Sequence, residues 1–439
     1  MEMVTLGIIG GGTVGGGVFQ ALQRNGSLLC SRAGFDFRVG RVVVRDVKKT
    51  RPVPIPQDLL GTDWKAAVED PSIQLVVELM GGTTTARQVV RRALELRKPV
   101  VTANKALLSA HGEELFALAR RRQANLYYEA SVAGGIPIIK VLREGLIGNR
   151  ITHLYGILNG TSNYILTRMK LEGLDFQEAL EEAQRLGYAE ADPSLDIDGH
   201  DAAQKAGILA SLAHGFWIRP EQIATLGIRH ITKLDIQFAT QLGYTIKLLA
   251  KVKQGDIEKG VRDRFRIHVS VSPTLVPNAH VLASVNHVFN AVLVRGDVAG
   301  DTLLYGRGAG QDATASAVLS DLADAASDLR VGLQGRLPPF VAHEHHGGVL
   351  PYKEAVFPYY VRLSVVDKPG TLAKIALLLG RAKIGISSVI QPEGHEGESV
   401  PLILMIHDAR HAAMTQALSQ IGRLAVVKAP PVMIPVELF

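Results

Sequence analysis

The strongest constraint on the fold is an apolar run near the N-terminus that leads directly into a cluster of glycines. Residues 4–9 (Val-Thr-Leu-Gly-Ile-Ile) have the composition of a buried parallel strand, and residues 10–15 (Gly-Gly-Gly-Thr-Val-Gly) fit the pattern G-x-G-x-x-G. Residues 18–22 continue with helical spacing. Such glycines allow a tight turn and bring backbone N–H groups to a pyrophosphate. The alternative is a glycine-rich turn without a ligand. The context predicts a dinucleotide-binding turn whose contact residues are Gly10, Gly12, Thr13, Val14 and Gly15.

Strands and helices alternate through the next hundred residues, which is typical of a doubly wound parallel sheet. We therefore expect residues 1–130 to form one α/β domain. The expected strands after the first are 37–45, 75–80, 99–102 and 126–130, and the expected helices after the first are 86–96 and 111–122.

The pattern changes near residue 131, where strands and helices mix as in an α+β domain that we expect to extend to residue 330. An Ala-rich helix over 308–324 is expected to pack back on the first domain. The other expected strands are 152–158, 243–251 and 264–271, and the other expected helices are 164–170, 176–185 and 202–214.

The C-terminal part is predicted to be a separate unit. Residues 331–356, rich in Gly, Pro and His, are predicted to be a linker. Residues 357–439 show a β-α-β-β-α-β order, which is the ferredoxin-like arrangement. The expected elements are strands 359–365, 386–391 and 400–406, helices 370–381 and 412–421, and a final strand that starts at 425–427.

Composition excludes several classes of protein. Cys30 is the only cysteine, so an intramolecular disulfide and a Cys-rich metal site are impossible, and we expect a reducing cytoplasm. No apolar run reaches about 18 residues, so no transmembrane helix is expected. The net charge of +6 is spread along the chain without a basic block, which argues against binding of nucleic acid. A general preference for anionic small molecules explains the charge as well.

An acidic stretch followed by a buried helix is the most specific feature of the middle of the chain. Five acidic residues and one lysine crowd into 190–205, and the apolar run 206–213 follows at once. Asp201 and Lys205 lie four apart, so they share one face of a helix at the edge of a core. A buried lysine needs a partner, which favours a chemical role; the alternative for Glu190, Asp201 and Lys205 is a structural ion-pair network.

Two basic positions lie where open α/β sheets bind ligands, at the carboxyl ends of strands. Arg45, helped by Lys48 or Lys49, suits a 2′-phosphate and so favours NADP, whereas Asp46 is a contrary sign, and a solvated basic turn is the alternative. Lys105 in Thr-Ala-Asn-Lys could face both cofactor and substrate, or could be a surface lysine at a helix start.

Three other clusters of polar residues give weaker evidence of a functional site. The aspartates of 192–201 lack the spacing of a calcium-binding hand. Residues 343–346 (His-Glu-His-His) lack the H-E-x-x-H spacing of a zinc site and lie in the expected linker. Residues 367–372 (Asp-Lys-Pro-Gly-Thr-Leu) form either a structural turn or a ligand loop.

Together these motifs resemble the homoserine dehydrogenase family, in the single-function form with a C-terminal ACT domain, over nearly the whole chain. The resemblance implies a Rossmann-type domain, a substrate and dimerisation domain, and an amino-acid-sensing ACT domain. The segments that carry it are Gly10–Gly15, Val101–Lys105, Tyr128–Pro137, Leu158–Tyr164, Gly187–Lys205 and Gly306–Leu322.

The resemblance implies reversible reduction of L-aspartate 4-semialdehyde to L-homoserine by NADPH, with NADH possible. Lys205 is then the proton donor, Glu190 and Asp201 hold the substrate amino group, Asp196 supports the site, and Lys105 is a second lysine near nicotinamide and substrate. Thr83 and Gly308 also contact the cofactor. The implied sodium site consists of Glu129 with the backbone oxygens of Val132, Gly134 and Ile136. L-threonine is the implied effector, and a homodimer or homotetramer the implied assembly.

Elementary chemistry agrees with these roles, because a lysine can stabilise and protonate the oxygen that gains charge during hydride transfer. Thr85 and Arg307 depart from the family's usual Pro and Gly-Pro-Gly pattern on the nucleotide side. One rival function, aspartate-semialdehyde dehydrogenase, needs a cysteine nucleophile, for which Cys30 is the only candidate. The other rival is a non-enzymatic amino-acid sensor with a decayed dehydrogenase body.

Overall fold

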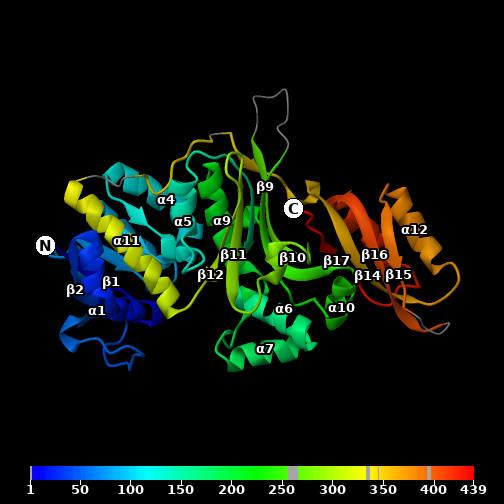
Figure 1. Ribbon diagram of the computed structural model, residues 1–439, viewed down its shortest axis with the longest axis horizontal. Coiled ribbons are helices and arrows are strands. Elements are labelled where there is room, and N and C mark those ends of the chain that lie inside the picture. Colours follow the sequence, from blue (N-terminus) through cyan, green and yellow to red (C-terminus); the bar gives the residue numbers. More distant parts are fainter. Residues whose placement is uncertain (1, 256–264, 333–336, 345, 393–396) are drawn as a thin grey trace. The chain divides into compact units, whose positions relative to one another are not determined.

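The computed structural model describes residues 2–255, 265–332, 337–344, 346–392 and 397–439, and its elements are labelled in Figure 1. The chain divides into two compact units, each of which is built from three segments. Unit 1 comprises Met1–Leu158, Ala203–Ile223 and Asn290–Gly347, and unit 2 comprises Asn159–Ala202, Ala224–Phe289 and Gly348–Phe439.

Unit 1 contains a six-stranded parallel sheet in the order β3-β2-β1-β4-β5-β6. The order reverses between β1 and β4, which is the switch point of a doubly wound sheet, so the predicted N-terminal α/β fold is confirmed. The strands are β1 (Glu2–Ile9), β2 (Phe35–Val43), β3 (Leu60–Gly61), β4 (Leu75–Glu78), β5 (Val100–Thr102) and β6 (Leu126–Tyr127). The helices are α1 (Thr13–Ala33), α2 (Trp64–Glu69), α3 (Thr84–Glu95) and α4 (Lys105–Arg122).

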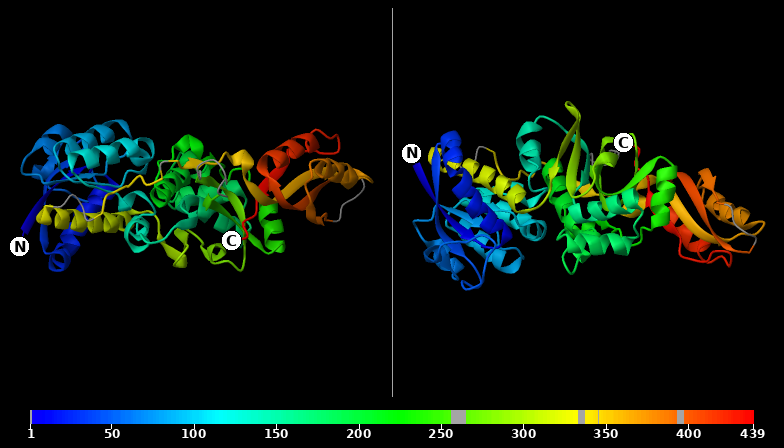
Figure 2. Two further views of the ribbon diagram at one scale, coloured as in Figure 1. Left: turned by 90° about the horizontal axis from the view of Figure 1, so that it is seen from above. Right: turned by 60° about the horizontal axis from the view of Figure 1, so that its bottom comes forward.

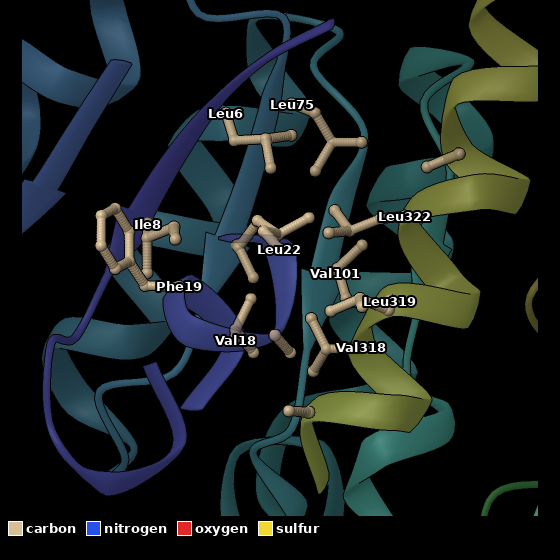
Figure 3. Close-up of a cluster of buried hydrophobic side chains, with 14 of the residues drawn as sticks. Leu6, Ile8, Val18, Phe19, Leu22, Leu75, Val101, Val318, Leu319 and Leu322 are labelled. Atoms are coloured by element: carbon tan, nitrogen blue, oxygen red, sulfur yellow. The ribbon is translucent and has the colours of Figure 1, made fainter. Parts of the chain in front are cut away.

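A helix from much later in the chain completes the core of this sheet. Helix α11 (Gln311–Val331) lies against α1, and Val318 and Leu322 join Val18 and Leu22 in one buried apolar cluster (Figure 3). The close approach depends on Gly17, because a Cβ there would lie 2.4 Å from Gln311 Cγ. The dinucleotide-binding sheet therefore depends on residues some three hundred positions away.

Several element boundaries in unit 1 differ from the predictions, and two of these differences concern predicted site residues. The helix expected from residue 111 begins at Lys105, because the Asn104 side chain accepts a hydrogen bond from Leu107 N and caps the first turn. The strand expected to reach residue 130 ends at Tyr127, and Glu129–Ser131 form a 3₁₀ turn. The Glu129 N–H donates to Asp321 instead of to a neighbouring strand.

The rest of unit 1 adds antiparallel strands and one long helix. Strand β11 (Phe289–Gly296) pairs antiparallel with β7 (Ile151–Ile157) and is followed by β12 (Gly300–Arg307). The β11–β12 pair was not among the predicted strands. The helical segments are α5 (Ile138–Lys140), the π-helical turn η3 (Val141–Gly145) and α9 (His200–His214), whose first residues belong to unit 2.

In unit 2, β9 (Tyr244–Gln254) and β10 (Arg266–Pro277) form a long antiparallel pair. The expected strand start at residue 264 lies outside the described residues. The short strands β8 (Ala224–Thr225) and β13 (Gly348–Val349) pair parallel with β10, so the predicted linker contains a short strand. The helices are α6 (Gly160–Glu172), α7 (Phe176–Arg185), α8 (Ser194–Ile197) and α10 (Lys233–Gln241). Over the described residues of both units, the 3₁₀ turns are η1 (Gln57–Leu59), η2 (Glu129–Ser131), η4 (Pro220–Gln222), η5 (Val281–Ser284) and η6 (Tyr352–Glu354).

The C-terminal part of unit 2 has the ferredoxin-like order β-α-β-β-α-β, with an antiparallel sheet in the order β15-β16-β14-β17. Both helices cover one face of this sheet and share its core (Figure 2). The final strand begins at Val432 and not at 425–427, since Pro430 and Pro431 lack N–H groups and only Val427 forms a bridge. The elements are β14 (Val356–Val366), α12 (Thr371–Arg381), β15 (Ile386–Ile390), β16 (Ser399–Arg410), α13 (His411–Ile421) and β17 (Val432–Pro435).

Among the described residues, no helix is both long enough and apolar enough to span a lipid bilayer.

Candidate active site

The glycine turn after β1 has the geometry of a pyrophosphate cradle. Gly10 has φ +114°, and a Cβ there would lie 2.5 Å from Leu79 O. A Cβ on Gly15 would lie 1.8 Å from Gly10 O, so neither position accepts a larger residue. Among the described residues, no atom lies within 4 Å of the position that a Cβ on Gly12 would take, and no side chain caps the first turn of α1. The N–H groups at this helix start are therefore placed to receive an anionic group, which fits a dinucleotide.

The loop after β2 presents basic side chains at the surface, together with the exposed side chain of Asp46. Asp46 Oδ1 accepts the Lys48 N–H at 2.8 Å. The Arg51 guanidinium, which the sequence analysis did not single out, donates to the carbonyl oxygens of Asp46 and Lys49 and orders the loop. Arg45 and Lys48 remain exposed at the carboxyl end of β2. The Asp46 carboxylate, the contrary sign for NADP, is exposed as well, and one of its oxygens accepts a hydrogen bond within its own loop.

A cavity of about 250 Å³ opens at the carboxyl ends of β4 and β5. One wall is the Gly81–Gly82 turn after β4, and the other is the start of α4 with Asn104 and Lys105. Of the predicted cofactor residues, Val14 and Lys105 line this cavity, while Thr83 follows the glycine turn as the residue before α3. Lys105 is the first residue of α4, which places it at the switch-point edge of the sheet.

Lys205 is buried in unit 1, with 7% of its surface exposed. Its Nζ donates a hydrogen bond of 2.7 Å to the carbonyl oxygen of Leu158, the residue that follows β7. Helix α9 also carries Asp201, four residues earlier and equally buried. Both predicted residues therefore lie inside the protein and not on a solvated face.

A hydrogen-bond network in unit 2 joins two of the predicted acidic residues. The Asn159 side chain donates to Asp196 Oδ1 at 2.7 Å and to Asp201 Oδ2 at 2.9 Å. Thr161 Oγ1 donates to the other oxygen of Asp196 at 2.9 Å. Asn159 also caps α6, since its Oδ1 accepts the Ser162 N–H. Asn159 is not among the predicted site residues, although the sequence Asn-Gly-Thr-Ser at a helix start is typical of a helix-capping asparagine.

The remaining acidic residues of this stretch lie apart from that network. The Glu190 side chain is exposed, and its backbone oxygen accepts a hydrogen bond from Gln184. Asp192 accepts hydrogen bonds from Ser194, and Asp198 forms an ion pair with Arg229. The network therefore brings together Asp196 and Asp201 and leaves Glu190 on the surface.

The predicted cation site is built around a buried carboxylate in unit 1. Glu129 is 2% exposed, and its two oxygens accept the N–H groups of Ile139 and Lys140 at 2.9 and 2.8 Å. Burial raises the pKa of Glu129 to about 7, against the lowering effect of these two hydrogen bonds. Ala133 and Gly134 have φ values of +55° and +40°, so the chain curls tightly beside it. One carboxylate with backbone oxygens is an all-oxygen donor set, which suits a hard cation.

Gly308 lies in a crowded position at the end of β12. A Cβ there would lie 2.2 Å from the Asn290 side chain, whose buried Nδ2 has no hydrogen-bond partner in the described part of the chain. A Cβ on Gly134 would in turn lie 2.8 Å from Gly308 O, and the Gly135 N–H donates to Arg307 O. The structure therefore brings Gly308 to the predicted cation loop, and it does not line the cavity beside Lys105.

The clusters that the sequence analysis set aside have local partners. Among the described residues, no group of three or more His, Cys, Asp or Glu could hold a metal ion. His343 bonds through Nδ1 to Val341 O, whereas His345 lies outside the described residues. In the 367–372 loop, Gln391 donates to Asp367, and Gly370 has φ +82° before α12.

A parallel switch-point sheet with an open glycine cradle, beside a cavity that contains a lysine, is typical of the dinucleotide-binding domain of oxidoreductases. Residues 10–129 match the sequence model described as the NAD-binding domain of homoserine dehydrogenase, and residues 137–323 match that of homoserine dehydrogenase. The chain belongs to the homoserine dehydrogenase family and has the activity of that family, an oxidoreductase step of amino-acid biosynthesis that uses homoserine or its semialdehyde.

Two relatives match this chain over almost the whole length of both proteins. Homoserine dehydrogenase of Pseudomonas aeruginosa is 42% identical over 100% of this chain and 99% of its own. The crystal structure of a homoserine dehydrogenase from Thiobacillus denitrificans is 40% identical, with a TM-score of 0.90, over 100% of this chain and 99% of that one. A hyperthermophilic archaeal homoserine dehydrogenase solved in complex with NADPH is 28% identical over 74% of this chain, with a TM-score of 0.61. These relatives decide between the dehydrogenase and its two rivals.

Proposed function

We propose that this chain interconverts L-aspartate 4-semialdehyde and L-homoserine with NADP(H), and that Lys205 is the proton donor. The observation that supports this proposal best is the burial of Lys205 with its ammonium group on Leu158 O. When bound, the nicotinamide supplies or accepts the hydride. The carbonyl oxygen of the semialdehyde becomes negative as hydride arrives, and Lys205 Nζ stabilises this charge and transfers a proton to the oxygen.

The acidic residues are assigned to the other end of the substrate. Asp201 and Glu190 hold the α-ammonium group, and Asp196 supports the site through Asn159. Because one Asn159 nitrogen donates to both aspartates, it holds one oxygen of each in place. Glu190 is exposed, so its part in this role requires that it approach the substrate from the surface. Lys105 is the second lysine, next to the nicotinamide end of the cofactor cavity.

The first experiment is the initial rate of NADP⁺ and NAD⁺ reduction with L-homoserine, with and without L-threonine. Turnover with NADP⁺ that threonine lowers supports the cofactor assignment and a threonine-sensing ACT domain over residues 357–439. Turnover that threonine leaves unchanged would contradict the regulatory proposal but not the proposed dehydrogenase activity. The ferredoxin-like order of this segment and its turn at Gly370 support the sensor. We further propose that the protein is cytoplasmic. We also propose that it forms a homodimer or homotetramer, and light scattering tests this by measuring the mass of the assembly.

Arg45 is expected to select NADP over NAD. Arg45→Ala should raise KM for NADP⁺ by about 10- to 100-fold, because a charge-assisted hydrogen bond contributes about 1.5–3 kcal/mol. KM for NAD⁺ should stay unchanged, since NAD⁺ lacks the 2′-phosphate. Arg41→Ala, which removes another exposed arginine near the end of β2, is the matched control. Equal rises in both KM values would contradict the assignment.

The proposed cation site of Glu129, Val132, Gly134 and Ile136 is tested by stability and not by turnover. We expect sodium chloride to raise the melting temperature above that in choline chloride of equal ionic strength, because a bound ion stabilises the folded state. Glu129→Gln should remove this difference, and Glu144→Gln should keep it. A sodium effect that survives in Glu129→Gln would place the ion elsewhere.

A further inference from the structure

Glu78 is a buried carboxyl group that none of the roles above uses. It is the last residue of β4, has no exposed surface and lies directly before the turn that lines the cofactor cavity. Thr102 Oγ1 donates to Glu78 Oε2 at 2.7 Å, and the Met80 N–H donates to Oε1 at 3.0 Å. The Gly81 N–H is a further donor. All of these groups donate to the carboxyl, which is the pattern that an ionised carboxylate satisfies best.

The network continues from Glu78 to the opposite wall of the cavity. Asn104 Nδ2 donates to Gly82 O at 2.8 Å and lies 3.4 Å from Glu78 Oε1. The same side chain caps α4 through Leu107 N, and the Asn104 N–H donates to Thr102 Oγ1. Lys105 is the next residue. Through Asn104, the glycine turn and the residue before Lys105 are thus held by one small set of hydrogen bonds.

Stability alone does not account for a carboxyl group at this position. Burial raises the pKa of Glu78, which means that the folded protein opposes its charge. An apolar residue such as its strand neighbour Val77 would avoid that desolvation cost. The group is nonetheless placed where the two walls of the cofactor cavity meet, and its donors come from both of them.

We propose that Glu78 is a positioning residue: it holds the Gly81–Gly82 turn and the start of α4 at a fixed separation and thereby sets the place of Lys105 in the cofactor cavity. This inference rests on the proposed role of Lys105. Glutamine has the same shape but offers one acceptor oxygen where Glu78 offers two. Either its NH₂ group faces the Met80 N–H, so that two donors meet, or Thr102 Oγ1 must turn to accept from it and lose its own donation, and in both cases the walls shift. A misplacement of about 1 Å at a reacting centre can cost about 100-fold in rate.

The test is Glu78→Gln, with Val77→Ala as the matched control on the same strand. We expect kcat for homoserine oxidation to fall by about 10- to 100-fold in Glu78→Gln. The dissociation constant for NADPH, measured by fluorescence titration, should change by less than kcat, because neither Gly12 nor Arg45 contacts Glu78 and a small shift of Lys105 affects the reacting centre most. Val77→Ala should lower the melting temperature and keep kcat. A kcat loss in Val77→Ala as large as in Glu78→Gln would reduce Glu78 to a structural residue and overturn the proposal.

A double-mutant cycle with Lys105→Ala separates this inference from the proposed function. If Glu78 acts through Lys105, Glu78→Gln should have no further effect on kcat in the Lys105→Ala background. Multiplying effects would overturn the route through Lys105. If kcat is normal in Glu78→Gln but low in Lys105→Ala, only the positioning role of Glu78 is refuted. If kcat is normal in Lys105→Ala, the proposed role of Lys105 is refuted, and the positioning role of Glu78 with it.

Discussion

Replacing Lys205 by methionine is expected to lower kcat by about a thousandfold in both directions, because one side chain both stabilises the developing oxyanion and transfers the proton. Methionine keeps the length and the apolar stem of lysine, so the buried position remains filled. KM for NADP⁺ should change little. The measurement is steady-state kinetics from either substrate, with circular dichroism to confirm folding.

Lys98→Met is the matched control for this prediction. Lys98 Nζ also donates to a backbone carbonyl, that of Asp70, and is partly buried in the same unit. Lys98 does not line the cofactor cavity, so its replacement should leave kcat unchanged. A folded Lys205→Met variant with a kcat close to that of the Lys98→Met control would refute the assignment of the proton donor.

Replacing Arg362 by methionine is expected to lower the free energy of unfolding by about 3–5 kcal/mol, because it leaves a buried carboxylate without its cationic partner. Arg362 on β14 donates to both oxygens of Asp235 on α10, at 2.7 and 3.0 Å, and the Asp235 side chain has no exposed surface. The pair holds the ferredoxin-like segment to the α6–α10 layer of the same unit. Urea unfolding followed by circular dichroism measures the loss.

Arg295→Met provides a control of matched geometry. Arg295 also donates to both oxygens of one aspartate, Asp301, at 2.6 and 2.8 Å, but the two side chains are 34% and 43% exposed. An exposed pair of this kind contributes about 0–1 kcal/mol, so the midpoint of unfolding should move little. Equal losses from the two replacements would mean that burial does not decide the strength of the Asp235–Arg362 pair.

Local patterns predicted local structure well. The strand before the glycine turn and helix 176–185 needed only composition and spacing, and α7 has the same bounds as predicted. Its Asp175–Glu178 capping box lies within the segment itself, which is why the sequence alone shows where the helix begins. Predicted element boundaries were wrong where a hydrogen-bond partner that the pattern does not show decides where the helix or strand begins or ends. Lys105 starts α4 because of the Asn104 cap, and Glu129 leaves the strand because Asp321 captures its N–H.

The amino-acid sequence by itself determined the family, the glycine turn, and the lysine and acidic residues of the middle segment. Each of these is a property of residue type and spacing along the chain. Only the tertiary structure decided that Asn159 joins Asp196 to Asp201, that Asp46 accepts a hydrogen bond from Lys48, and that the donors to Glu78 come from the segments after two different strands. The physical reason is that a hydrogen bond depends on distance and direction in space. The partners of Glu78 and Asn159 lie 24 and 42 residues away, and no periodicity in the sequence encodes which of many polar residues will arrive there.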